Sequence, residues 1–215
     1  MALPLPLRWW YRWAGRRREV MSRQNILFIP RGCLRNDPSL ADPSLADPSL
    51  ADPSLAVKDG RLHFYIENQG VYQWATLPGG DDPPVFGRYA RRGRWARENT
   101  TLSQHLILTC LFEAVMCHGK YNASIAWLEE EKFAEIVRQV PPLAIPPWRW
   151  LDTRFFVKNG VFMLAAENGV GKPYGGKRAR SGEKRYYSVQ VAAKTEAPLQ
   201  FLKPLVGDNW DYVTF

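Results

Sequence analysis

Residues 61–76 read RLHFYIENQGVYQWAT and hold the clearest structural pattern in the chain. Apolar and polar side chains alternate along 61–67, which predicts a half-buried β-strand. Asn68, Gln69 and Gly70 form a short turn in which Gly70 can take a positive φ, and residues 71–76 return as the partner strand. One side of the first strand carries Leu62, Phe64 and Ile66, and the other carries His63, Tyr65 and Glu67.

The segments that follow this hairpin indicate an interruption and then a buried helix. DDPPV at 81–85 is expected to end strand pairing or to run as an edge strand, because proline has no N–H to donate. Thr101-Leu102-Ser103-Gln104 matches a capping box. A helix is therefore expected from there to about Cys117, with Gly119 just beyond its end. Its sequence is apolar nearly all round, which is typical of a central, buried helix.

The second half of the chain contains the strongest hairpin signal. RFFVKNGVFMLAA at 154–166 has Asn-Gly at its centre, which suits a type I′ turn. Asn122 is expected to cap a helix over 123–139. Strands and helices fall into separate groups, so we expect an α+β fold. The remaining predicted elements are a helix at 7–14, a strand at 185–192, a short helix capped by Thr195 that carries Leu199, Phe201 and Leu202, and a strand at 210–215.

Residues 37–56 are four copies of DPSLA. A proline in every copy forbids a helix interior or a central strand, so an extended surface loop is expected, with a partner-binding linear motif as the alternative. The predicted organisation has three parts. Residues 1–35 form a basic, aromatic helix and lead-in that belong to the domain, 36–58 form the repeat loop, and 59–215 form the main domain.

The composition excludes several classes of protein. With 215 residues, 46% hydrophobic and 23% charged, the chain is too apolar for a disordered protein. It has no apolar run near the ~18 residues of a membrane helix, so no membrane association is expected. Three cysteines are too few for a disulfide scaffold, which favours a reducing, cytoplasmic location.

Positive charge is concentrated in three segments of this chain of net charge +8. Residues 1–35 hold eight arginines and one acid, a net of +7, and residues 172–185 hold six basic residues and one acid, a net of +5. Basic segments beside aromatic residues can follow a phosphate backbone, so nucleic-acid binding is one alternative, and a solvated surface is the other. The third cluster is Arg88, Arg91, Arg92, Arg94 and Arg97.

Motifs for catalysis or metal binding are incomplete. GKPYGGKR at 171–178 approaches a phosphate-binding loop, but Arg178 replaces the Ser or Thr that would hold Mg²⁺. Cys110, Cys117 and His118 lack a further ligand for a metal site, and no nucleophile elbow is present. We therefore expect no enzyme, no cofactor and no metal. An enzyme remains the weakest alternative, with His63 and Glu67 as its candidate groups.

The order of several motifs resembles the SUKH superfamily, the Smi/Knr-like proteins that include bacterial toxin-immunity proteins. Members often have a strand ending in Glu-Asn-Gln, then a tryptophan, then Pro-Pro-Val, as in Glu67-Asn68-Gln69, Trp74 and Pro83-Pro84-Val85 here. LPLRWWYRWAGR near the start, and VQVAAKTEAPLQFLKPL followed by Trp210 near the end, are similar to the segments that flank this region in members. Trp95, Glu98 and TLSQHLILTCLFEAV also follow the pattern.

The resemblance implies an antiparallel or mixed sheet with helices packed mainly on one face. It also implies a non-catalytic module that binds a protein partner, such as a toxin. Trp, Tyr and Arg dominate binding hot spots, and all three types occur in one predicted loop. The Glu-Asn-Gln motif has a structural interpretation as well, because its side chains can bond turn amides. The candidate partner-binding residues are Glu67, Asn68, Gln69, Trp74, Arg88, Tyr89, Arg94 and Trp95.

Overall fold

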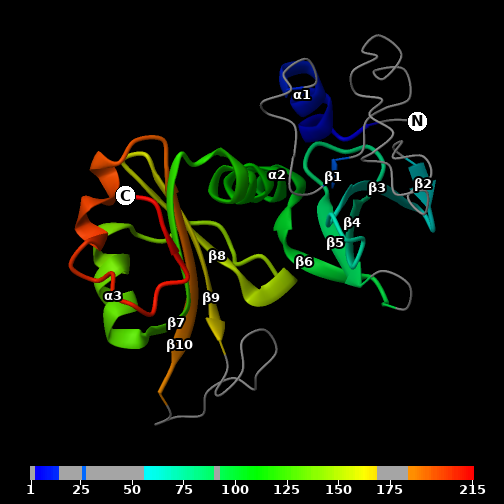
Figure 1. Ribbon diagram of the computed structural model, residues 1–215. Helices are drawn as coiled ribbons and strands as arrows, with labels where there is room; N and C mark the ends of the chain where they lie inside the picture. Colours follow the sequence, from blue (N-terminus) through cyan, green and yellow to red (C-terminus); the bar gives the residue numbers. More distant parts are fainter. Residues whose placement is uncertain (1–2, 15–25, 28–55, 90–92, 169–183) are drawn as a thin grey trace. The chain divides into compact units, whose positions relative to one another are not determined.

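The computed structural model describes residues 3–14, 26–27, 56–89, 93–168 and 184–215 (Figure 1). Residues 36–55 of the predicted repeat loop, the GKPYGGKR segment and Cys33 lie outside the described residues, so the predictions made for them stay predictions. The last three residues of that predicted loop, 56–58, form a strand instead. No helix in the described ranges is both long and apolar enough to cross a membrane.

The chain divides into two compact units, Met1–Ile107 and Leu108–Phe215, called here the first and second units. Each unit contains one antiparallel sheet, with the strand order β1-β3-β4-β5-β6 in the first unit, where β2 also pairs with β3, and β11-β7-β10-β9-β8 in the second. The predicted α+β class is confirmed. We had expected a single sheet, with the boundary of the main domain near residue 58. The division observed between Ile107 and Leu108 falls inside helix α2 (Leu102–Glu113).

The first sheet is built around the predicted hairpin, which forms strands β3 (Arg61–Ile66) and β4 (Tyr72–Thr76). The alternation predicted a half-buried β3, and this was wrong, because residues 62–67 are all buried. A β-bulge between His63 and Tyr65 shifts the register against β4. The short strands β1 (Ile26–Leu27) and β2 (Ala56–Lys58) both pair with β3.

The proline-rich segment joins the sheet as an interior strand. Strand β5 (Pro84–Tyr89) lies between β4 and β6 (Ala96–Thr101), so both expected alternatives, an end of strand pairing and an edge strand, were wrong. Pro84 is the first residue of β5, a position where a missing N–H is tolerated. Its carbonyl accepts a hydrogen bond of 2.9 Å from the Thr76 hydroxyl.

Helix α2 begins where the capping box predicted. The Gln104 side chain accepts a bond of 3.1 Å from the Thr101 N–H. Asp82 adds a cap from the DDPPV segment, because its carboxylate accepts bonds of 2.8 Å from the Ser103 N–H and 2.6 Å from the Ser103 hydroxyl. The N–H of Leu102 also donates to the Pro83 carbonyl. The segment 81–83 therefore fixes the start of the helix.

Helix α1 (Leu5–Ala14) belongs to the first unit and begins slightly earlier than the predicted range of 7–14. Leu7 is fully buried, while Trp10 and Tyr11 are half-buried. The Leu5 N–H donates to the Gly80 carbonyl at 3.0 Å, which ties the start of α1 to the loop before β5. The helix thus buries Leu7 and partly covers the two aromatic residues that follow it by three and four positions.

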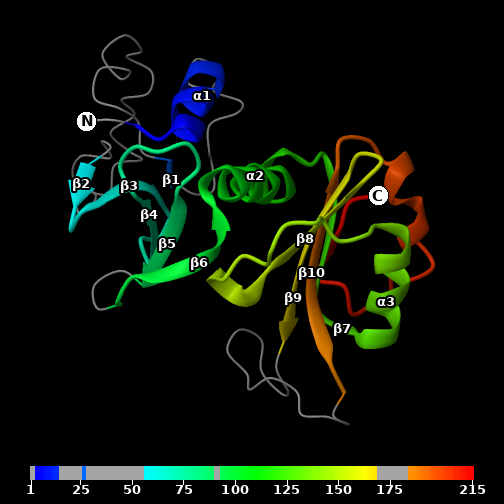
Figure 2. The same ribbon diagram turned by 180° about the vertical axis from the view of Figure 1, so that it is seen from behind.

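The secondary-structure prediction was wrong at one point in the second unit. We expected one helix over 123–139, but residues 121–129 form strand β7 (Tyr121–Glu129), and only helix α3 (Glu130–Gln139) follows (Figure 2). β7 is held between β10 (Tyr186–Ala193) and β11 (Tyr212–Val213). Asn122 caps no helix; its amide donates to the Gly119 carbonyl at 3.3 Å.

The Asn-Gly hairpin is confirmed as β8 (Arg154–Lys158) and β9 (Val161–Asn168). Asn159 and Gly160 have φ values of 50° and 81°, as a type I′ turn requires. β9 then pairs with β10 along its whole length. The strand predicted at 185–192 is confirmed as β10, and only Tyr212 and Val213 of the strand predicted at 210–215 form β11.

Helical segments contact both faces of the second sheet. One face packs with α3 and the 3-10 helix η7 (Ala197–Leu202) in a core that includes Ile125, Val189 and Trp210. Glu196, not the predicted Thr195, occupies the cap position of η7. On the other face, a π-helical turn η5 (Ala114–His118) lies against β10 and β9. The 3-10 helix η6 (Trp150–Asp152) precedes β8.

Gly119 follows the end of η5, as predicted, and its backbone is extended, with φ −72°. A Cβ atom at this position would lie 2.4 Å from the Cβ of Ala192 on β10. Gly119 is therefore required for close approach of the chain to the sheet.

Candidate functional site

The Glu67-Asn68-Gln69 motif forms the turn between β3 and β4. The Glu67 carboxylate accepts hydrogen bonds of 3.0 Å from the Gln69 N–H and 3.2 Å from the Val71 N–H. The backbone of Glu67 also bonds Tyr72 and Gly70. The side chain of Glu67 is buried, whereas Asn68 and Gln69 are exposed. The structural role expected for Glu67 is thus realised, and Asn68 and Gln69 are the members of the motif that remain exposed.

Trp74 lies inside the first unit and has no exposed surface. Its ring packs against Tyr65 at 5.0 Å, Tyr72 at 4.9 Å and His105 at 5.6 Å between ring centroids. A partner-binding residue needs an exposed surface, so Trp74 does not belong to the candidate binding surface.

The four remaining candidates lie at the adjoining ends of β5 and β6. Arg88 and Tyr89 end β5, and Arg94 and Trp95 directly precede β6. The N–H of Gly93 donates to the Tyr89 carbonyl at 3.1 Å, which closes the connection between the two strands. Tyr89 is 62% exposed, Arg94 is exposed, and Arg88 and Trp95 are half-buried. The predicted loop therefore brings these residue types together at one end of the first sheet.

Arg88 is held by several contacts. Its guanidinium lies over the Trp95 ring at 4.3 Å from the centroid. Its Nε and Nη2 atoms lie 3.4 and 3.2 Å from Oε1 of Gln73, which is its cross-strand neighbour on β4. Its Nη1 atom lies 3.9 Å from the carboxylate of Asp59. Stacking and hydrogen bonding together fix the guanidinium plane.

Two further residues, Arg61 and Phe86, lie beside Arg88 and Trp95 and were not predicted from the sequence. The Arg61 guanidinium lies 4.7 Å from the centroid of Phe86 and 5.8 Å from that of Trp95. The available signal was strand alternation, because Arg61 and His63 share one side of β3. Cross-strand pairing places Gln73 against Arg88, and Ala75 against both His63 and Phe86. We call the set of Arg61, His63, Gln73, Phe86, Arg88 and Trp95 the basic-aromatic face.

His63 is the buried titratable group of this face. It is 7% exposed and meets the Trp95 ring edge-on at 5.1 Å. Its pKa is lowered from 6.5 to about 4, mainly by burial and also by the charges of Arg88 and Lys58, while Asp59 and a hydrogen bond to the Lys58 backbone oppose the shift. His105 is fully buried on α2, and burial lowers its pKa to about 3. Both imidazoles are therefore neutral at pH 7.

These two histidines predict a loss of stability in weak acid. The pKa values of both histidines in the folded chain lie below the ordinary value of 6.5. Below pH 6.5 the unfolded chain therefore binds more protons than the folded chain, which favours unfolding. The stabilising contribution is complete above pH 6.5 and decreases as the pH falls from 6.5 toward 4. Urea unfolding across this range measures it, and His63→Gln should reduce the slope. An imidazole signal of His63 that titrates near 6.5 in the folded protein would contradict the prediction.

The cysteine–histidine pattern on α2 and η5 gathers no metal-binding group. Among the described residues, no three His, Cys, Asp or Glu side chains lie close enough to hold an ion. Cys110 is half-buried, and burial raises the pKa of its thiol to about 12. A thiol with this pKa is protonated at neutral pH and is a poor nucleophile.

Comparisons with protein-family models, with curated proteins and with solved structures find no match to this chain.

Proposed function

We propose that this chain is a non-catalytic protein-interaction module of the SUKH type, an immunity protein that binds a toxin partner in the cytoplasm. The observation that carries the proposal is the cluster of Arg88, Tyr89, Arg94 and Trp95 at the ends of β5 and β6. These are hot-spot residue types, and they are displayed by a sheet with a buried core. Of the motifs behind the resemblance, Glu67-Asn68-Gln69 directly follows β3, Trp74 lies on β4, and Pro84-Val85 begins β5, and these three strands are neighbours in the first sheet.

The structural role of Glu67 supports a binding function over catalysis. Its carboxylate is engaged with two turn amides. His63, the other candidate group, is buried and neutral at pH 7. A general acid or base must reach the proton that it transfers. Neither group has this access, so the exposed residues of the turn and of the β5–β6 ends are the available surface.

The test is co-expression with the products of the genes encoded beside this one, read by gel filtration and by rescue of cells from a toxic product. Wild-type chain should co-elute with one partner and rescue growth. The variant Tyr89→Ala with Arg94→Glu should lose both effects, and Tyr212→Ala serves as a control, because Tyr212 is 55% exposed in the second unit. Absence of a complex and of rescue by the wild-type chain would refute the proposal.

Nucleic-acid binding is the second candidate, favoured by the net charge of +8 and by the arginines near the β5–β6 connection. It predicts affinity for single-stranded DNA that falls steeply with added salt. A gel-shift series at increasing salt distinguishes it from protein binding, and absence of a shift at low salt would exclude it.

A further inference from the structure

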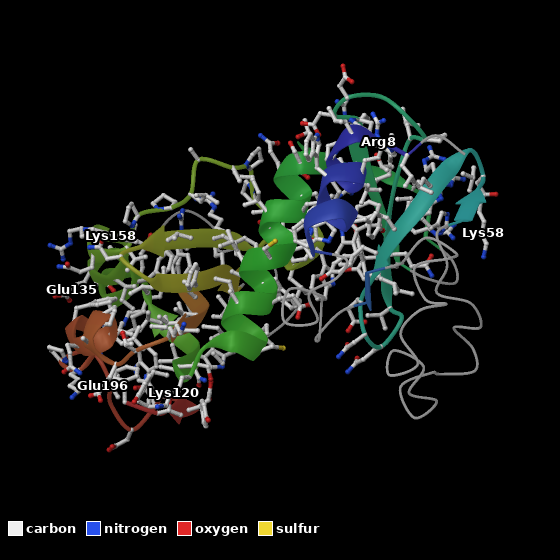
Figure 3. The ribbon with its side chains drawn as sticks, turned by 90° about the horizontal axis from the view of Figure 1, so that it is seen from above. Arg8, Lys58, Lys120, Glu135, Lys158 and Glu196 are labelled. Carbon is white, nitrogen blue, oxygen red and sulfur yellow. The ribbon has the colours of Figure 1, made fainter. Side chains whose placement is uncertain are left out.

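The basic-aromatic face carries an excess of positive charge that is held in fixed positions. Arg61 and Arg88 lie on neighbouring aromatic rings, and Lys58 stands exposed at the β2–β3 turn (Figure 3). Asp59 is the acidic group close to them in the described chain, and its side chain is 69% exposed. The charges of Arg88 and Lys58 also lower the pKa of His63, so they act on the buried imidazole of this face.

This face also contains buried polar atoms that lack a partner. Within the described residues, Nε of Arg61, Nε2 of His63 and Nε1 of Trp95 make no hydrogen bond. His63 is 7% exposed, and its ring lies against the ring of Trp95. A buried donor without an acceptor is unfavourable, and most folded proteins avoid it. These donors are buried, so a ligand would meet the cations that still have exposed surface, which are Lys58 and the half-buried Arg61 and Arg88.

The arrangement suits a carboxylate better than a nucleobase. Proteins that bind single-stranded nucleic acid use aromatic faces on which bases stack. Here the rings of Phe86 and Trp95 are already covered by Arg61 and Arg88. Gln73 and Asp59 use part of the five N–H donors that each guanidinium carries, and the remaining donors can pair with a carboxylate. The carboxylate of Asp59 already lies 3.9 Å from Arg88 Nη1. A carboxylate of a partner would make the same kind of ion pair.

We infer that the basic-aromatic face binds an acidic segment of a protein partner, with Arg61 and Arg88 pairing with its carboxylates and Asp59 acting as a built-in competitor. This inference rests on the proposed function and names the chemistry of the partner. Positive charge on this face attracts an acidic segment and speeds the encounter. The two stacked arginines are held before binding, so less side-chain freedom is lost on pairing.

The test uses the full chain and a penta-glutamate peptide as the probe, with oligo-thymidine as the alternative ligand. Side-chain Nε–H signals of arginine in NMR spectra report which arginines bind. The peptide should shift the signals of Arg61 and Arg88, and Arg88→Gln should weaken binding by about tenfold. Arg154→Gln is the control, because Arg154 is an exposed strand arginine of the second unit. Asp59→Asn should tighten binding by about threefold, because it removes the competing charge.

A second matched pair checks that the effect is local and not due to net charge. Lys58 and Lys158 each end a strand before a two-residue turn, Asp59-Gly60 and Asn159-Gly160, whose residues have positive φ (Figure 3). Lys58→Gln should weaken the peptide by about threefold, and Lys158→Gln should leave it unchanged.

Each outcome bears on the inference. Tighter binding of oligo-thymidine than of the peptide at the same arginines would overturn it in favour of nucleic acid. Peptide binding that Arg154→Gln weakens as much as Arg88→Gln would overturn it as well. If a toxin partner co-elutes equally with wild type and with Arg88→Gln, the proposed function stands and this inference fails. If the peptide binds at Arg61 and Arg88 but no partner is found, the inference about the basic-aromatic face stands and the proposed function fails.

Discussion

Replacing Gly87 with alanine is expected to lower the free energy of unfolding of the first unit by about 3 kcal/mol. Gly87 is a buried residue of β5. A Cβ there would lie 2.5 Å from the Tyr72 hydroxyl and within contact of Glu98 Oε1. The Tyr72 hydroxyl donates a hydrogen bond of 3.1 Å to that oxygen. The added methyl group must therefore displace a buried hydrogen-bonded pair, and a buried carboxylate that loses a partner is strongly destabilising.

Urea unfolding, together with hydrogen exchange of the β4 and β5 amides, measures this effect. Gly207→Ala is the matched control, because Gly207 is exposed and the nearest atom to an added Cβ is the side-chain oxygen of Asn209 at 3.3 Å. That variant should change stability by less than about 0.5 kcal/mol. Equal stability of Gly87→Ala and wild type would show that Tyr72 and Glu98 do not pack as described.

Replacing Glu67 with alanine is expected to lower the free energy of unfolding by about 3 kcal/mol, since a hydrogen bond to a charged group contributes about 1.5 kcal/mol or more. The carboxylate serves two amides of the β3–β4 turn, and alanine leaves both without this acceptor. Glu67→Gln keeps an oxygen acceptor and should lose about half as much. Urea unfolding measures both variants.

The Glu67 variants distinguish a structural role of the Glu-Asn-Gln motif from a role in partner binding. Gln69→Ala is the control, because its side chain is exposed and the backbone N–H that serves Glu67 remains. It should leave stability within about 0.5 kcal/mol of wild type. If Glu67→Ala instead kept its stability and lost only partner binding, the carboxylate would belong to an interface and the structural role would be wrong.

The hairpins were predictable because their signals are local. Asn159-Gly160 dictates its own turn, and the alternation along 61–67 continues into a partner strand across three residues. The strand at 121–129 was missed because no turn residue separates it from α3. Glu129 ends the strand and Glu130 begins the helix, so the sequence pattern of the two elements was interpreted as a single helix. Strand β7 is selected by pairing with β10 and β11, partners that lie far away in the sequence.

The candidate site was predicted in part for the same reason. Arg88, Tyr89, Arg94 and Trp95 are close in sequence, so their proximity in the hairpin could be expected. Arg61 and Phe86 join them through cross-strand packing, which depends on a register that one sequence does not reveal. Trp74 was expected at a surface because tryptophan is common in interfaces. Its burial depends on His105 of α2, a contact across 31 positions of the chain.

The position of Glu98 has a consequence for self-association. It lies on β6, the last strand in the described order of the first sheet, and its side chain points into the core while Arg97 and Asn99 on either side are exposed. An inward-pointing charge on an outermost strand disfavours pairing of that strand with another chain. Such a strand cannot form a continuous apolar surface with an added strand. The carboxylate that packs against Tyr72 thus also protects the sheet from growing into aggregates at high concentration.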